Sequence, residues 1–84
     1  MISVRHRTLV AIFVRPTRSD IRWANIETLV RGVGGQVLER AGSRVAFILN
    51  GARAVFHRPH PRPTVSKGAV DAVRRCLVTA RVKP

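Results

Sequence analysis

Residues 43–57 read SRVAFILNGARAVFH, two apolar runs joined by Asn-Gly at positions 50 and 51. Asn-Gly between alternating apolar runs is the strongest short-range signal for a β-hairpin, because both residues tolerate a left-handed backbone. A two-residue turn at this point fixes the register of the two strands. The register places three apolar pairs on one face, which we expect to face the core: Leu49 with Ala52, Phe47 with Ala54, and Val45 with Phe56.

The opposite face of the predicted hairpin is polar at one end, where Arg44 lies across from His57. A short strand is predicted just before the hairpin, over residues 36–40 (QVLER), with Ala-Gly at 41–42 as its turn. If this turn also has two residues, Glu39 lies across from Arg44 on the same outer face. The sequence then predicts Glu39, Arg44 and His57 in a row across three strands.

Helices are expected before and after these strands in the sequence. Apolar residues recur at i, i+3, i+4 and i+7 over 23–33, which predicts a helix. A last helix is predicted over 66–80, where Val70, Val73 and Leu77 form an apolar stripe with Cys76 beside it. Residues 8–14 fit either a helix capped by Thr8 or a strand, because period alone does not decide so short a run.

The Pro-rich segment 58–63 cannot continue a strand, because three of its six residues lack an amide donor. These elements predict an α+β domain, in which a three-stranded antiparallel sheet packs on helices. We expect residues 20–84 to form this single domain and residues 1–19 to be an N-terminal extension.

The charge of the chain is strongly unbalanced. Sixteen Lys and Arg residues stand against four Asp and Glu residues, a formal net charge of +12 in 84 residues. Such an excess indicates a polyanionic partner, and fourteen of the sixteen are Arg, whose planar fork binds phosphate. We expect RNA rather than DNA. The alternative explanation is codon bias in a GC-rich genome.

Several other classes of protein are disfavoured. The single cysteine, Cys76, excludes an internal disulfide and a cysteine zinc cluster, and no cofactor is expected. No apolar run approaches the roughly 20 residues that span a bilayer. The run at 8–14 is followed by Arg15 and Pro16 rather than by a cleavage site for a signal peptide, so we expect a cytoplasmic protein.

The predicted row of Glu39, Arg44 and His57 has the groups that metal-free RNA cleavage needs. The 2′-hydroxyl attacks the adjacent phosphorus, so a base must take its proton and a cation must stabilise the transition state. The alternative is a solvated sheet face with one cross-strand ion pair, worth about 0.2–1 kcal/mol. His57 and His60 are three apart, but the prolines between and after them forbid a metal-binding helix.

Aromatic stacking on bases is not expected, because the chain has no Tyr and two of its three Phe are assigned to the core face. Trp23, at the start of a helix, is expected to be a core residue or a hydrophobic staple. Recognition should therefore depend on phosphates and groove shape.

Four features together resemble the HicA-type toxins over about residues 20–80. They are the Gly-Ser at 42–43 entering a strand, the Pro-His-Pro at 59–61, the Lys67-Gly68 that begins the last helix, and the order of the elements. The resemblance implies an α-β-β-β-α core like that of double-stranded-RNA-binding domains. It also implies metal-independent cleavage of mRNA and a co-encoded HicB-like antitoxin.

The chain departs from that family at its usual catalytic histidine, which directly follows the Gly-Ser. Here the position is Arg44. Arginine stays protonated near neutrality and cannot act as a general base. We therefore expect Arg44 to hold the phosphate, with Glu39 orienting it. His57 is the expected base, and His60, which matches the Pro-His-Pro histidine, is the second choice.

Five more residues are expected to bind RNA: Ser43, Arg53, Arg58, Arg62 and Lys67. Two functions remain open, a HicA-like ribonuclease toxin and a non-catalytic RNA-binding module of the same fold. A DNA-binding or ribosome-associated basic protein is a third, smaller possibility.

Overall fold

Within residues 3–84, three α-helices and a three-stranded antiparallel sheet make up the fold, as the α+β prediction requires. The structure is a computed structural model that describes residues 3–84, so Met1 and Ile2 of the expected extension lie outside the described residues. The elements follow in the order α1 (Val4–Phe13), α2 (Trp23–Gly32), β1 (Gln36–Glu39), β2 (Arg44–Leu49), β3 (Ala52–His57) and α3 (Lys67–Thr79).

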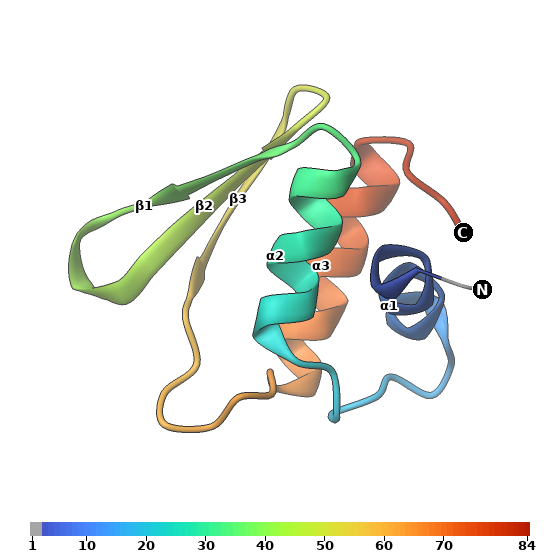
Figure 1. Ribbon diagram of the computed structural model, residues 1–84, viewed down its shortest axis with the longest axis horizontal. Helices are drawn as coiled ribbons and strands as arrows, with labels where there is room; N and C mark the ends of the chain where they lie inside the picture. Colours follow the sequence, from blue (N-terminus) through green and yellow to red (C-terminus); the bar gives the residue numbers. More distant parts are fainter. Residues whose placement is uncertain (1–2) are drawn as a thin grey trace.

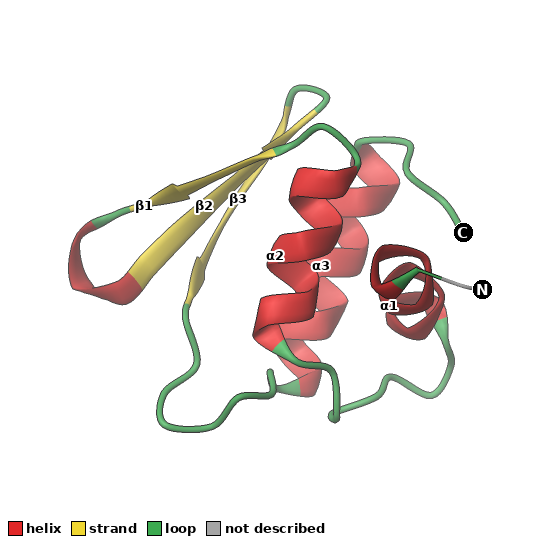
Figure 2. Cartoon of the chain, viewed as in Figure 1, coloured by secondary structure: helices red, strands yellow, loops and turns green. Residues whose placement is uncertain are grey.

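The elements form three layers (Figure 1). The sheet has the order β1-β2-β3. Helices α2 and α3 lie against one face of it, and α1 crosses them on the side away from the sheet. Long loops gather at one end of the molecule, where β3 leads into α3 and α1 leads into α2 (Figure 2). No helix within residues 3–84 is long and apolar enough to cross a membrane.

The β2–β3 hairpin confirms the predicted register. Arg44 pairs with His57, and the three apolar pairs lie opposite one another as expected. Asn50 and Gly51 form the turn with φ values of 49° and 84°, the left-handed backbone that this dipeptide favours. Val45, Phe47 and Leu49 are fully buried, so this face meets the helices.

The predicted pairing of Glu39 with Arg44 is wrong. A three-residue turn, Ala41–Ser43, joins β1 to β2 in place of the expected two-residue turn. Gly42 and Ser43 both have positive φ, at 71° and 64°. Glu39 therefore pairs with Val45. Because a one-residue shift moves a side chain to the other face of a strand, Glu39 lies on the side of the helices.

An aromatic cluster fills the core between the sheet and α2. The Trp23 ring stacks on Phe47 with centroids 5.3 Å apart, and Phe56 lies 5.2 Å from Phe47. This confirms the expectation that Trp23 is a core residue. Cys76, beside the apolar stripe of α3, is buried, and burial raises the pKa of its thiol.

The alternative left open for residues 8–14 is settled in favour of a helix, which begins earlier than expected. Ser3 caps α1 by accepting a hydrogen bond from the His6 amide at 3.1 Å, whereas Thr8, the expected cap, is buried within the helix. Leu9 and Ile12 also face the core.

A buried arginine fastens α1 to α3. The Nε of Arg74 donates to the Ile12 carbonyl at 2.8 Å. Its Nη1 donates to Asp71 at 2.8 Å and its Nη2 to the Thr17 hydroxyl at 3.1 Å. Thr17 in turn donates to Asp71 at 2.8 Å. All three nitrogens of this nearly buried guanidinium donate hydrogen bonds, which offsets the cost of removing its charge from water.

Candidate functional site

An open pocket of about 460 Å³ lies where β3 leads into α3. His57, the last residue of β3, lines it together with His60 and Arg62 from the following segment. Ser66, at the start of α3, forms another part of its wall. Three residues that the sequence singled out for RNA chemistry therefore share one pocket.

The backbone fixes the wall of this pocket. β3 ends at His57, as the Pro-rich sequence predicted, and the chain then runs beside the connector before α2. The Trp23 amide donates to the Pro63 carbonyl at 2.9 Å, and the Val65 amide donates to the Ile21 carbonyl at 3.0 Å. Together with the β-bridge between Arg22 and Thr64, these bonds hold the segment in place.

The N-terminus of α3 supplies a positive end beside the pocket. The Ser66 hydroxyl accepts a hydrogen bond from the Ala69 amide at 3.2 Å and caps the helix. Lys67 is the first helical residue and is exposed. Unpaired amides and the helix dipole attract anions at such an end. Together with Arg62, this part of the pocket is suited to a phosphate group.

Arg44 and His57 lie side by side on the outer face of the sheet as Cα partners of neighbouring strands. Both side chains are exposed. The Arg44 Nε donates to the Ala41 carbonyl at 3.0 Å, which holds the base of the guanidinium against the β1–β2 turn. Among the described residues no carboxylate forms an ion pair with Arg44. The guanidinium can therefore meet an external anion.

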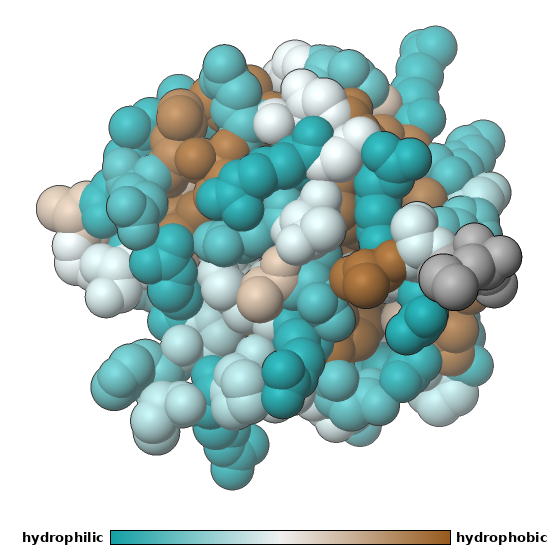
Figure 3. All heavy atoms as spheres, in the orientation of Figure 1, coloured by the Kyte–Doolittle hydropathy of each residue, from teal (hydrophilic) through white to brown (hydrophobic). Residues whose placement is uncertain are grey.

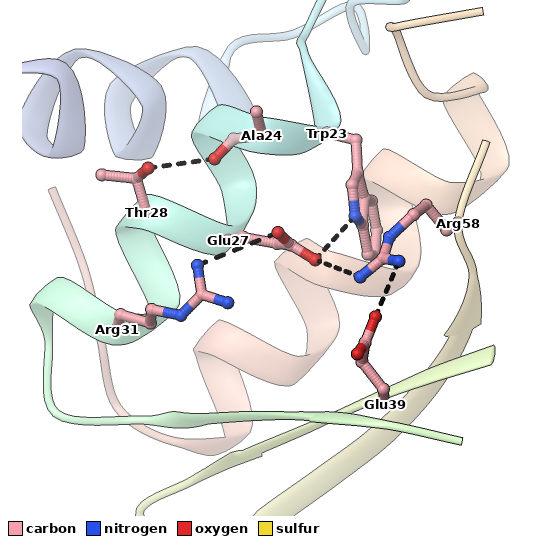
Figure 4. Close-up of polar contacts among 7 residues, drawn as sticks. All are labelled: Trp23, Ala24, Glu27, Thr28, Arg31, Glu39 and Arg58. Atoms are coloured by element: carbon pink, nitrogen blue, oxygen red, sulfur yellow. Dashed lines mark hydrogen bonds and ion pairs between the residues drawn. The ribbon is translucent and has the colours of Figure 1, made fainter. Parts of the chain in front are cut away.

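Arg58 and Glu39, both expected in the site, instead belong to an ion-pair cluster on the opposite face of the sheet (Figure 4). Arg58 Nη1 donates to Glu39 at 2.9 Å and Nη2 donates to Glu27 at 3.2 Å. Glu27 also accepts from the Trp23 indole at 2.9 Å and lies 3.8 Å from Arg31. The bonds to Glu39 and Glu27 raise the pKa of Arg58. Two carboxylates thus hold this arginine next to the pocket segment.

The other predicted residues are spread more widely. The Ser43 carbonyl accepts from the Arg58 amide at 2.9 Å, which places Ser43 beside the start of the pocket segment. Arg53 lies at the far end of β3, where it lines a separate hollow with Arg75 and Cys76. The structure therefore does not bring Arg53 together with His57.

Two contributors to the site were not singled out in the sequence. Ser66 could have been recognised as a serine that precedes a helix, the usual N-cap signal. Glu27 could have been paired with Trp23 by their i, i+4 spacing, but its contact with Arg58 joins residues 31 apart and has no local signal. Within residues 3–84, no three His, Cys, Asp or Glu side chains gather closely enough to hold a metal ion.

The architecture defines a small, strongly basic α+β domain with a cationic, histidine-lined pocket. A family model described as the HicA toxin of bacterial toxin–antitoxin systems matches residues 23–77, more than half of the chain. The chain belongs to the HicA toxin family. The match begins at the first residue of α2, so α1 lies outside it. Searches of curated proteins and of solved structures gave no match.

Proposed function

We propose that this protein is the toxin of a toxin–antitoxin pair and that it binds mRNA and cleaves it without a metal. The observation that carries the proposal is the shared pocket of His57, His60 and Arg62, with Arg44 beside His57 on the sheet. Membership of the HicA family supports the toxin role. An action on mRNA would place the protein in the cytoplasm.

Phosphate binding is assigned to the cationic groups around the pocket. Arg62 and the N-terminus of α3, including Lys67, would hold phosphates that flank the scissile one. Arg44 would hold the scissile phosphate through charge-assisted hydrogen bonds. Arg58 is assigned a positioning role, because its guanidinium is already bonded to Glu39 and Glu27.

The chemistry assigned to the site needs two proton transfers. His57 accepts the proton of the 2′-hydroxyl as its oxygen forms a bond to phosphorus. Arg44 stabilises the negative charge that develops on the phosphoryl oxygens. The bond from phosphorus to the 5′-oxygen then breaks, and His60 donates a proton to that leaving oxygen. The products would be a cyclic phosphate and a 5′-hydroxyl end.

Four single variants test this assignment against a defined RNA: His57→Ala, His60→Ala, Arg44→Ala and His6→Ala. His6 is an exposed residue of α1 outside the pocket, so its variant is the matched control. Loss of a general base or acid typically lowers the rate about 100- to 10,000-fold, and loss of a donor that stabilises transition-state charge lowers it about 100- to 1,000-fold. We expect such losses for the first three variants and none for the control. Full cleavage by His57→Ala, with unchanged folding, would overturn its assignment.

The fold of residues 20–84 is proposed to be that of a double-stranded-RNA-binding domain, with residues 1–19 as an extension. The order α2-β1-β2-β3-α3, with both helices on one face of the sheet, supports this. Such domains recognise the shape of an RNA duplex across its grooves. The absence of an exposed Trp or Tyr among the described residues agrees with recognition through phosphates.

A second candidate function is RNA binding without cleavage. Arg44 favours it, because the position that usually carries the HicA histidine holds a group that cannot accept a proton. The two candidates differ in the RNA recovered after incubation. Intact RNA in a tight complex would establish the binding module, whereas fragments with 5′-hydroxyl ends would establish the ribonuclease.

The partner is proposed to be an acidic, HicB-like antitoxin that covers the face carrying Arg44 and His57. No helix within residues 3–84 covers this outer face (Figure 1). Val55, midway along β3 on this face, is 52% exposed. Figure 3 shows apolar residues reaching the surface over the strands, amid hydrophilic ones. An exposed apolar residue flanked by cationic groups suits a protein partner of opposite charge.

A further inference from the structure

A second cationic hollow lies between α1, the connector to α2 and the first turn of α2. Three arginines line it: Arg7 from α1, Arg18 from the connector, and Arg22, the N-cap of α2. Its volume of about 110 Å³ is several times the share of one liquid water molecule, so it has room for a phosphate group. All three arginines precede the residues that the family model matches.

The charge of this hollow is positive even though a carboxylate lines it. Asp20 accepts two hydrogen bonds from Arg18, at 2.8 and 2.6 Å, so these two groups neutralise each other. Arg7 and Arg22 take part in no ion pair among the described residues. Their two charges are therefore left to attract an anion.

The start of α2 adds to the attraction. Its N-cap residue, Arg22, makes no side-chain capping hydrogen bond among the described residues, and Asn25 from the first turn lines the hollow. The positive end of the helix dipole thus lies beside the two unpaired guanidinium groups. Both α2 and α3 begin at the same end of the molecule (Figure 1), so their positive ends add over one surface.

This hollow adjoins the pocket of His57 and Arg62. Arg22 and Thr64 form a β-bridge, and Thr64 lines the first pocket while Arg22 lines the second hollow. Along the connector, Ser19 faces the first pocket, whereas Arg18 and Asp20 face the second. The two sites are therefore separated only by a pair of bridged backbone segments.

We infer that Arg7, from the N-terminal extension, and Arg22, the N-cap of α2, form a second phosphate-binding site that lengthens the RNA-binding surface. One RNA molecule would occupy both sites, because they share a wall. The inference rests on the proposed function in that it requires RNA as the ligand. It adds a contact made by residues outside the matched family region.

The test is the salt dependence of binding to an RNA duplex of about 16 base pairs. The logarithm of the association constant falls linearly with the logarithm of the salt concentration, and each lost phosphate contact makes this slope shallower by about 0.7 to 0.9. Because the hollow holds one phosphate, Arg7→Gln/Arg22→Gln should reduce the magnitude of the slope by about 0.7 to 0.9 relative to the wild type. Arg81→Gln/Lys83→Gln is the matched control, because it removes the same charge beyond the other end of α3.

Arg7→Lys/Arg22→Lys keeps both charges and should keep the wild-type slope, which guards against a change in folding. The inference is overturned if the Gln variant has the wild-type slope, or if the control loses as much. Failure of the proposed function looks different, because the wild type itself would then bind the duplex weakly or with a flat slope.

Discussion

Arg58 donates a hydrogen bond to Glu39 over 2.9 Å, which joins the residue after β3 to the last residue of β1 across the width of the sheet. The same guanidinium reaches Glu27 on α2. The pocket segment that follows Arg58 therefore leaves the sheet from a point fixed to both β1 and α2. The two carboxylates differ in exposure, since 74% of the Glu39 side chain is exposed and only 14% of that of Glu27.

Stability should depend on these two carboxylates unequally. Glu39→Gln should change the free energy of unfolding by less than about 1 kcal/mol, because exposed ion pairs contribute little. Glu27→Ala should cost about 1–3 kcal/mol, because the largely buried Trp23 indole loses its hydrogen-bond acceptor. Urea denaturation of both variants measures the difference. Equal costs would show that the exposure of the carboxylates does not govern their contribution.

The buried Arg74 and its exposed neighbour Arg75 form a matched pair on α3. Arg74→Ala should cost about 1–3 kcal/mol, because it leaves the Ile12 carbonyl without its donor and removes one of the two donors to Asp71. Arg75→Ala should change the free energy of unfolding by less than about 0.5 kcal/mol, as exposed substitutions usually do. Thermal or urea unfolding compares them. A mild effect of Arg74→Ala would mean that α1 does not depend on this contact.

Acid should weaken the contact between the connector and α3. The Thr17 hydroxyl, with Arg74 nearby, holds the pKa of Asp71 below its usual value. A carboxyl group whose pKa is lower in the folded than in the unfolded protein stabilises the fold. This stabilisation is complete above the pKa of the unfolded protein, about 3.9, and is lost as the pH falls through the pKa of the folded protein. The advantage of the wild type over Asp71→Asn should therefore be constant near neutrality and shrink below about pH 4.

Thr17→Val provides the control for that titration, because it removes the hydroxyl donor and leaves Asp71 in place. An NMR titration should show a higher pKa for Asp71 in this variant than in the wild type. The same pKa in both proteins would contradict the role given to Thr17.

The antitoxin prediction can be tested with two exposed valines. Co-expression with a neighbouring acidic gene product should yield a complex that inhibits the toxin. Val55→Glu on the outer sheet face should weaken this complex at least about tenfold, equivalent to 1.4 kcal/mol. Val78→Glu should not, because Val78 is similarly exposed, at 55%, but lies on α3. Equal weakening by both variants, or no complex with any neighbouring gene product, would contradict the proposed surface.

The β2–β3 hairpin could be predicted in full because its signal is local. Asn50 and Gly51 set both the turn and the register, and the alternating apolar residues leave one face for the core. The β1–β2 turn could not, because Ala-Gly allows several loop lengths. Ser43 adopts a positive φ that its residue type does not favour, and this adds the third turn residue.

Only the part of the candidate site that depends on local sequence signals could be predicted. His57 beside Arg44 follows from the hairpin register, whereas His60 and Arg62 enter the pocket only through the path of the Pro-rich segment. The sequence predicts that Arg58 binds RNA, because the carboxylates that bind it come from α2 and β1, far away in the sequence. Contacts of this kind leave no pattern in a single sequence.

The anchoring of α1 by Arg74 has a consequence for where the folding unit begins. The region matched by the family model starts at α2, yet Leu9 and Ile12 of α1 are part of the continuous core. A chain shortened to that start would expose apolar surface on α2 and α3 and leave the Arg74 charge without the Ile12 carbonyl. We therefore expect the smallest stable unit of this protein to be longer than the segment that the family model matches.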